Sequence, residues 1–164
     1  MSETSQPPQL PNASAVADDE SKDAGRRRST YRVFLSHGSA DNYIAKELIV
    51  PKLSAAGAVV FIDDGAIEYG ADFRARIFAE LALVDELCLL VTPTSVERPW
   101  IFAELGVAIH RQIRVIAVIY GPHGDDLQKK GISSLLGTHL TLPLDDFGRY
   151  VEQLRNRIAS KNHG

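Results

Sequence analysis

The regular alternation of short apolar runs with helix-like segments most constrains the fold of this chain. The apolar runs are rich in aliphatic residues, which predicts strands buried on both faces, at 31–37, 58–64, 86–91, 114–120 and 138–144. The intervening segments carry apolar residues close to helical spacing, at 40–57, 72–84, 99–110 and 145–160. The alternation predicts an α/β protein: a flavodoxin-like three-layer sandwich with a central five-stranded parallel sheet.

Local signals refine these helices. Pro51 is expected to kink or break the first helix, because its ring clashes with a carbonyl one turn earlier. Asp72 suits a helix cap, and Pro99 suits a first helical turn. Residues 121–137 are predicted to form a loop with one short helix.

The first 30 residues differ from the rest. Residues 1–30 are rich in Ser, Pro, Asp and Ala and hold no aromatic residue, so they are predicted to form a disordered tail before a domain at 31–160. Three arginines at 26–28 can contact an anionic partner, but the acids just before them favour a solvated linker.

Charge and cysteine content narrow the class of protein. A formal net charge of -3 and a pI near 5.9 argue against a general nucleic-acid or membrane-surface binder. No apolar run reaches the roughly 18 residues of a membrane span, and no secretory signal is visible at the N-terminus. The single cysteine, Cys88, lies in an apolar run, which indicates a buried thiol in a reducing compartment. We therefore expect a cytoplasmic protein.

Ligands of such sheets bind beyond the carboxyl ends of the strands. The first strand is followed there by a small polar loop that contains Ser36, His37, Ser39 and Asp41. Free amides at the next helix suit a phosphate or ribose, whereas helix capping by Ser39 or Asp41 needs no ligand. Both interpretations stay open, and neither a Walker pattern nor a G-x-G-x-x-G fingerprint is present.

Two acids, Asp63 and Asp64, end the second strand. Such a pair can hold Mg²⁺, as in receiver domains, but the other residues of a receiver site are missing and turn formation into Gly65 is the simpler interpretation. The remaining histidines lack metal-ligand spacing, and we predict no metal site.

Trp100 and Glu104 lie four residues apart, which puts them on one face of a helix. On spacing alone, a solvated Glu104 and a core Trp100 are favoured. The alternative is a carboxylate beside an aromatic side chain at the ligand edge, where a carboxylate can bind ribose hydroxyls and stabilise positive charge at an anomeric carbon.

Three segments together resemble Toll/interleukin receptor (TIR) domains of the bacterial type. "YRVFLSHGSAD" resembles the first TIR box, "FIDDGAIEYGADF" resembles the second strand with its BB loop, and "CLLVTPTSVERPWIFAEL" resembles the segment that carries the catalytic glutamate. The motifs occur in family order and spacing, and the resemblance covers about residues 31–160.

The resemblance implies a flavodoxin-like fold and an NAD⁺ glycohydrolase or cyclase, with NAD⁺ as substrate and no cofactor, often in antiphage defence or signalling. Glu104 would be the catalytic residue. The predicted substrate-binding residues are Phe34, Ser36, His37 and Ser39 of the first box, Asp64 and Tyr69 of the BB loop, and Trp100.

The resemblance also implies self-association through the BB loop and a separate sensor or effector protein. The chain departs from the family at Arg32, at Tyr69 and at "THLTL", which replaces the third box of receptor TIR domains. Two other functions remain as alternatives: a non-catalytic TIR–TIR interaction module, and a nucleoside deoxyribosyltransferase that uses a Glu nucleophile.

Overall fold

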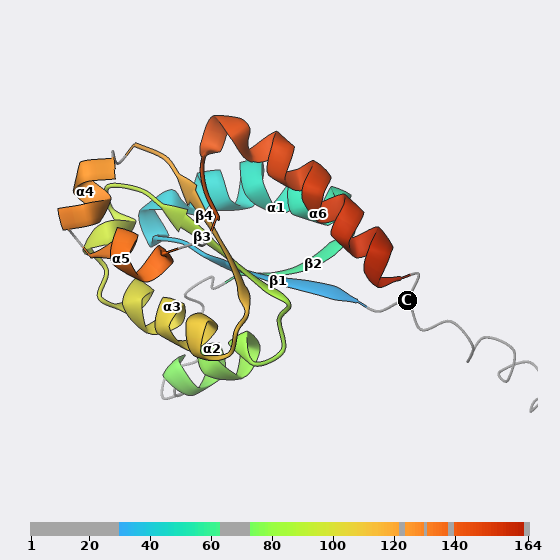
Figure 1. Ribbon diagram of the computed structural model, residues 1–164, viewed down its shortest axis with the longest axis horizontal. Helices are drawn as coiled ribbons and strands as arrows, with labels where there is room; N and C mark the ends of the chain where they lie inside the picture. The colour runs from blue at the N-terminus through green and yellow to red at the C-terminus, as the bar shows by residue number, and fades with distance from the viewer. Residues whose placement is uncertain (1–29, 63–72, 122–123, 130, 138–139, 163–164) are drawn as a thin grey trace, which may run out of the picture.

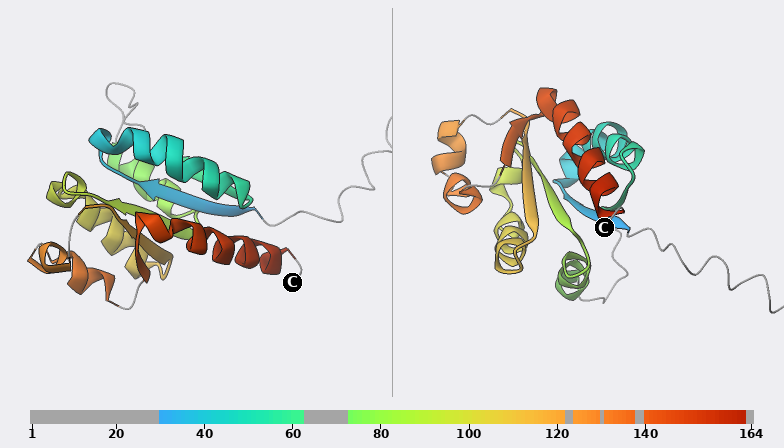
Figure 2. Two further views of the ribbon diagram at one scale, coloured as in Figure 1. Left: turned by 90° about the horizontal axis from the view of Figure 1, so that it is seen from above. Right: turned by 45° about the vertical axis from the view of Figure 1, so that its right-hand side comes forward.

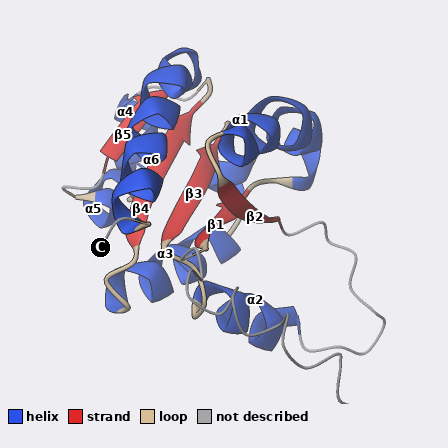
Figure 3. Cartoon of the chain, turned by 90° about the vertical axis from the view of Figure 1, so that its right-hand side faces the viewer, coloured by secondary structure: helices blue, strands red, loops and turns tan. Residues whose placement is uncertain are grey.

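The computed structural model describes residues 30–62, 73–121, 124–129, 131–137 and 140–162. Its strands are β1 (Tyr31–Ser36), β2 (Ala58–Ile62), β3 (Glu86–Val91), β4 (Arg114–Ile119) and β5 (Leu140–Pro143). They form one five-stranded parallel sheet in the order β2-β1-β3-β4-β5 (Figure 3). The predicted fold class is confirmed, and β1, β4 and β5 each end one residue before the predicted boundary.

Helices cover both faces of the sheet (Figure 1). The helices are α1 (Val50–Ala55), α2 (Phe73–Leu81), α3 (Trp100–His110), α4 (Gly124–Lys129), α5 (Ile132–Leu136) and α6 (Phe147–Lys161). Helices α1 and α6 lie side by side over one face (Figure 2), while α2, α3 and the shorter α4 and α5 lie on the other. The segment after β4 thus contains two short helices in place of the one predicted.

Each face has its own apolar core, because successive strand residues point to opposite sides. Val33, Leu35 and Cys88 pack under α1 and α6, whereas Phe34 and Leu87 pack under α2 and α3. Cys88 is fully buried, as predicted, and burial followed by the charge of Glu86 raises the pKa of its thiol.

The first helix does not break at Pro51, although its regular α-helical pattern changes just before that residue. It continues from Asn42 to Ala55, with a π-helical segment, η2 (Ile44–Ile49), directly before α1. Pro51 sits in the first turn of α1. Because proline lacks an N–H and its ring crowds the preceding turn, a wider π turn before it lets the helix continue.

The order of the strands places a topological switch point between β1 and β3. The chain runs from β1 outward to β2 and then crosses back to β3 on the other side of β1. Ligand sites of doubly wound sheets lie at such a switch point. Ser36 ends β1 and Thr92 follows β3, so the two loops to compare are those after β1 and β3.

Candidate functional site at the carboxyl edge of the sheet

Glu104 is a buried carboxylate on α3. Its side chain is 2% exposed, between the buried Ile101, Leu105 and Ala108 of the same helix. The hydroxyl of Ser36, at the end of β1, donates a hydrogen bond to Oε2 of Glu104. A buried carboxylate is costly unless it is hydrogen-bonded, and Ser36 meets that need. The preference for a solvated Glu104, based on spacing, is therefore wrong.

Trp100 is only partly buried, and it packs against the apolar core of the α2 and α3 face. Its ring stacks on Phe78 of α2, with ring centroids 5.7 Å apart and planes 25° apart. Glu104 is thus more buried than Trp100, the reverse of the order expected from spacing. Both lie on one face of α3, but Glu104 meets the end of β1, whereas Trp100, one turn earlier, meets α2.

The loop after β1 is folded around Asp41. The predicted capping role of Ser39 or Asp41 is not found: the 3₁₀ turn η1 (Ser39–Asp41) has no side-chain cap. Asp41 is buried and accepts a hydrogen bond from Thr92 Oγ1 at 2.7 Å. A Cβ on Gly38 would lie 2.7 Å from Oδ2 of Asp41, so only glycine fits there without a shift.

The loop after β3 is fixed by Thr92 and Ser95. The Thr92 amide donates to Ser95 Oγ at 2.8 Å, and the Ser95 amide donates to Thr92 Oγ1 at 3.1 Å. Both side chains are buried. Arg98, just beyond, donates from Nη1 to the backbone carbonyl of His37. The loops after β1 and β3 are thus joined twice, through Asp41–Thr92 and through His37–Arg98.

His37 is buried and bonded at one ring nitrogen. Its Nε2 lies 2.8 Å from Oδ1 of Asn42, whose carbonyl oxygen can only accept, so Nε2 carries the proton. Among the residues that the structure describes, Nδ1 has no hydrogen-bond partner. His37 therefore presents a buried acceptor next to Ser36.

The predicted site residues divide into three groups. Ser36 and Glu104 are in direct contact, and His37 follows Ser36 in the chain. Phe34 is buried in the core under α2 and α3, and Ser39 is exposed. Asp64 and Tyr69 lie outside the described residues. Sequence reasoning missed Thr92, Ser95 and Arg98, although their place directly after a parallel strand was the available signal.

A second polar cluster lies at the opposite, amino edge of the sheet and was also missed. Glu86 is fully buried and accepts hydrogen bonds from Tyr31 at 2.8 Å and Tyr150 at 2.6 Å. Arg157 of α6 pairs with it at 3.2 Å. Burial and the charge of Glu86 raise the pKa of Tyr31 to about 12. Because its members join β1, β3 and α6, we assign this cluster to stability.

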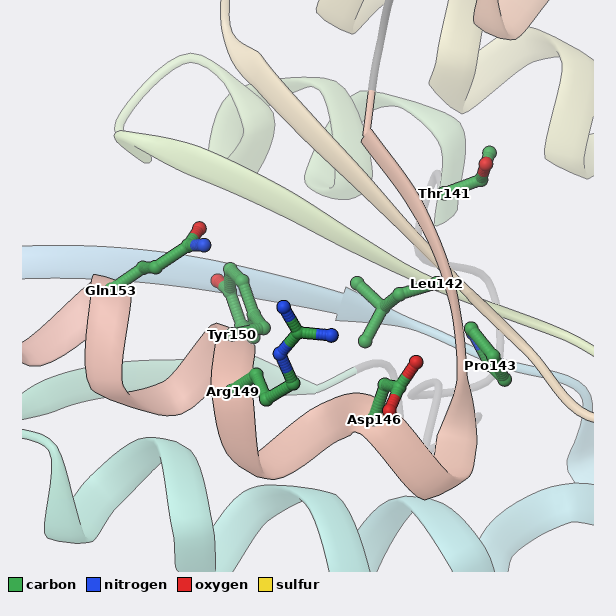
Figure 4. Close-up of a pocket in the computed structure, with 7 residues that line it drawn as sticks. All are labelled: Thr141, Leu142, Pro143, Asp146, Arg149, Tyr150 and Gln153. Atoms are coloured by element: carbon green, nitrogen blue, oxygen red, sulfur yellow. The ribbon is translucent and has the colours of Figure 1, made fainter.

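A cleft of about 210 Å³ lies between β5 and α6 (Figure 4). Its walls are Thr141, Leu142, Pro143, Asp146, Arg149, Tyr150 and Gln153. No residue of the Ser36–Glu104 contact lines it, so the cleft is separate from the candidate site. The polar contacts at the carboxyl ends of β1 and β3, and not this cleft, define the candidate site.

The described part of the chain contains no group of three or more His, Cys, Asp or Glu side chains placed to hold a metal ion. Within the same residues, no helix has both the length and the apolar character that crossing a membrane requires.

Comparisons with known proteins agree with this geometry. Residues 33–155 match the sequence model described as the TIR domain. The structure resembles the TIR domain of the Toll-related receptor TRR-2 from Hydra magnipapillata, with a TM-score of 0.57 and 20% identity over 79% of this chain and 99% of that one. It also resembles a metazoan TIR-STING receptor from C. gigas, with a TM-score of 0.54 and 16% identity over 82% of this chain and 42% of that one.

At these identities the two structures support the fold alone. A search of curated protein sequences found no significant match. The family assignment rests on the sequence model, whose match extends over well more than half of the chain and includes both loops of the candidate site. This chain therefore belongs to the TIR domain family.

Proposed function

We propose that this TIR domain cleaves NAD⁺ at the bond between nicotinamide and ribose, as bacterial-type TIR glycohydrolases and cyclases do. One observation carries the proposal: Glu104 is a buried carboxylate at the ligand edge of a parallel sheet, and Ser36 holds it from a neighbouring strand.

The chemistry requires little more than a well-placed negative charge. The C1′–N bond breaks, and its electron pair leaves with the nicotinamide nitrogen, which loses its positive charge. The ribose becomes an oxocarbenium ion. Water then adds to C1′ and loses a proton, which gives ADP-ribose, or an adenine nitrogen of the same molecule adds there, which gives a cyclic isomer. A fixed carboxylate stabilises the developing positive charge, more strongly in a site shielded from water.

Ser36 acts in this proposal by orienting Glu104. Its hydroxyl donates to one oxygen of the carboxylate, which fixes the rotamer of Glu104. Trp100, partly exposed one turn before Glu104, offers a flat apolar wall. Substrate contacts of Phe34, His37, Ser39, Asp64 and Tyr69 stay predictions.

The proposal extends to the setting of the enzyme. It places the protein in the cytoplasm, in antiphage defence or signalling, with self-association through the BB loop and a separate sensor or effector protein. Only the family membership and the resemblance of 65–71 to a BB loop support this part.

Glu104→Gln tests the catalytic assignment. The amide keeps the shape and an acceptor for Ser36 but removes the negative charge. We expect nicotinamide release from NAD⁺ by purified protein, assembled with a crowding agent, to fall by about 100-fold or more. Chromatography of nicotinamide and of the second product measures this loss and identifies the product.

Glu152→Gln is the matched control, because it makes the same change at an exposed carboxylate of α6, which packs on the opposite face of the sheet from α3. Its turnover should equal that of the unmodified protein. Equal turnover in Glu104→Gln would refute the catalytic role. No turnover by the assembled unmodified protein would favour the non-catalytic interaction module.

A further inference from the structure

Arg98 carries a positive charge to the candidate site. Its backbone is extended, with φ −86° and ψ 116°, because the following Pro99 disfavours the helical region. The side chain therefore departs before α3 begins and crosses to the loop after β1, where Nη1 donates to the His37 carbonyl. One of the guanidinium donors thus fixes the position of the Arg98 side chain.

Within the described residues, no ion pair balances the charge of Arg98. None of the described carboxylates forms an ion pair with Arg98, although its side chain is partly buried. Two buried acids of the candidate site accept hydrogen bonds from other residues, Asp41 from Thr92 and Glu104 from Ser36. A partly buried guanidinium without an anionic partner is suited to bind an anionic ligand.

Arg98 is also the single strongly basic residue in the segments that directly follow the strands. The segments that follow the five strands contain a single Lys or Arg, namely Arg98, in 37–43, 63–72, 92–99, 120–123 and 144–146. The same segments contain several Asp and Glu residues. Within these loop segments, Arg98 is therefore the cation that can meet a phosphorylated ligand.

We propose that Arg98 binds the diphosphate of the substrate and so selects a nucleotide over an unphosphorylated nucleoside. The inference relies on the proposed function for the nature of the ligand. In NAD⁺ the diphosphate is esterified to the 5′ oxygen of the nicotinamide ribose, so a ribose held at Glu104 places its phosphate nearby. A guanidinium has five donors in a planar fork, and those left after the His37 contact match phosphate oxygens.

Binding measured without turnover tests this role. Titration calorimetry compares ADP with adenosine, which lacks the diphosphate, on the unmodified full-length protein and on Arg98→Gln. We expect the unmodified protein to bind ADP about tenfold or more tightly than adenosine, and Arg98→Gln to lose this preference. Arg111→Gln, the same charge change at the far end of α3, should keep it.

Arg98→Lys guards against a folding defect, since it keeps a charge and a donor but not the planar fork. Its preference for ADP should fall at least about threefold. Equal binding of ADP and adenosine by the unmodified protein, or an unchanged preference in Arg98→Gln or Arg98→Lys, would overturn the inference. Arg98-dependent ADP binding without nicotinamide release would instead refute the proposed function and leave the role of Arg98 intact.

Discussion

At the scale of residues, the candidate site depends on polar side chains that are buried and satisfied by one another. Ser36 and Glu104 are 68 residues apart in sequence, and Asp41 and Thr92 are 51 apart. Each of these two buried carboxylates accepts a hydrogen bond from a residue distant in sequence. Such pairs are costly to break singly, because the remaining partner is left buried without its hydrogen bond.

Gly38→Ala tests how tightly the loop after β1 is packed. A Cβ there would lie 2.7 Å from the Asp41 carboxylate, which is held by Thr92 and has little room to move. We expect the free energy of unfolding in urea to fall by about 1–3 kcal/mol.

Gly106→Ala is the counterpart of that substitution on α3. Gly106 is exposed in the helix interior, and nothing lies within 4 Å of its added Cβ. Alanine should raise the free energy of unfolding by about 0.5–1 kcal/mol, because it restricts the unfolded chain. Equal effects at the two glycines would contradict the close packing at Gly38.

At the scale of elements, α6 is tied to the sheet by Glu86. The carboxylate of this β3 residue accepts from Tyr31 on β1 and from Tyr150 on α6, and it pairs with Arg157. Lys161 of α6 adds a contact to Asp85 at 2.6 Å. The last helix is thereby fixed in register on the strands that lead to the candidate site.

Stability should fall at high pH because of this cluster. The folded state raises the pKa of Tyr31 from 10.0 to about 12, since burial and then Glu86 disfavour the phenolate. The resulting stability is fully present below pH 10.0 and is lost as the pH rises through about 12. Urea unfolding across that range should show a falling midpoint.

Tyr31→Phe should flatten this pH dependence, because its ring cannot ionise. Tyr120→Phe, at an exposed tyrosine, should behave as the unmodified protein. Tyr150 contributes in the same direction, since burial and Glu86 raise the pKa of its phenol as well. A Tyr31→Phe protein with an undiminished slope would remove Tyr31 from the explanation.

At the scale of the whole molecule, α6 lies beside α1 over one of the two apolar cores. It buries Phe147, Tyr150, Val151, Leu154 and Ile158. At about 1.5–3 kcal/mol each, this burial is similar in size to the whole stability of a typical domain, about 5–15 kcal/mol. A chain that ends at Asp146 should therefore show no cooperative thermal unfolding.

Deletion of residues 1–29 is the matching truncation at the other end. The prediction that residues 1–30 form a tail outside the domain implies an unchanged thermal midpoint. A large loss of stability would show that this segment belongs to the folded domain.

The sequence by itself determined the order and type of the elements, because periods of 2 and 3.6 residues follow directly from backbone geometry. It also determined which segments reach the carboxyl edge, since strands joined by helical crossovers run parallel. Helix α3 was predicted to within a residue, 99–110 against Trp100–His110. The behaviour of Pro51 was not predictable in this way, because a π turn costs little once tertiary packing holds the helix.

Only the tertiary structure decided which side chains of that edge are buried. Spacing puts Trp100 and Glu104 on one face of α3, but it cannot say which of them meets the sheet and which meets α2. The answer depends on how α3 rotates on the sheet, and that rotation is set by packing in the apolar core of that face. The contacts Ser36–Glu104 and His37–Arg98 follow from it, since each joins residues more than 60 positions apart.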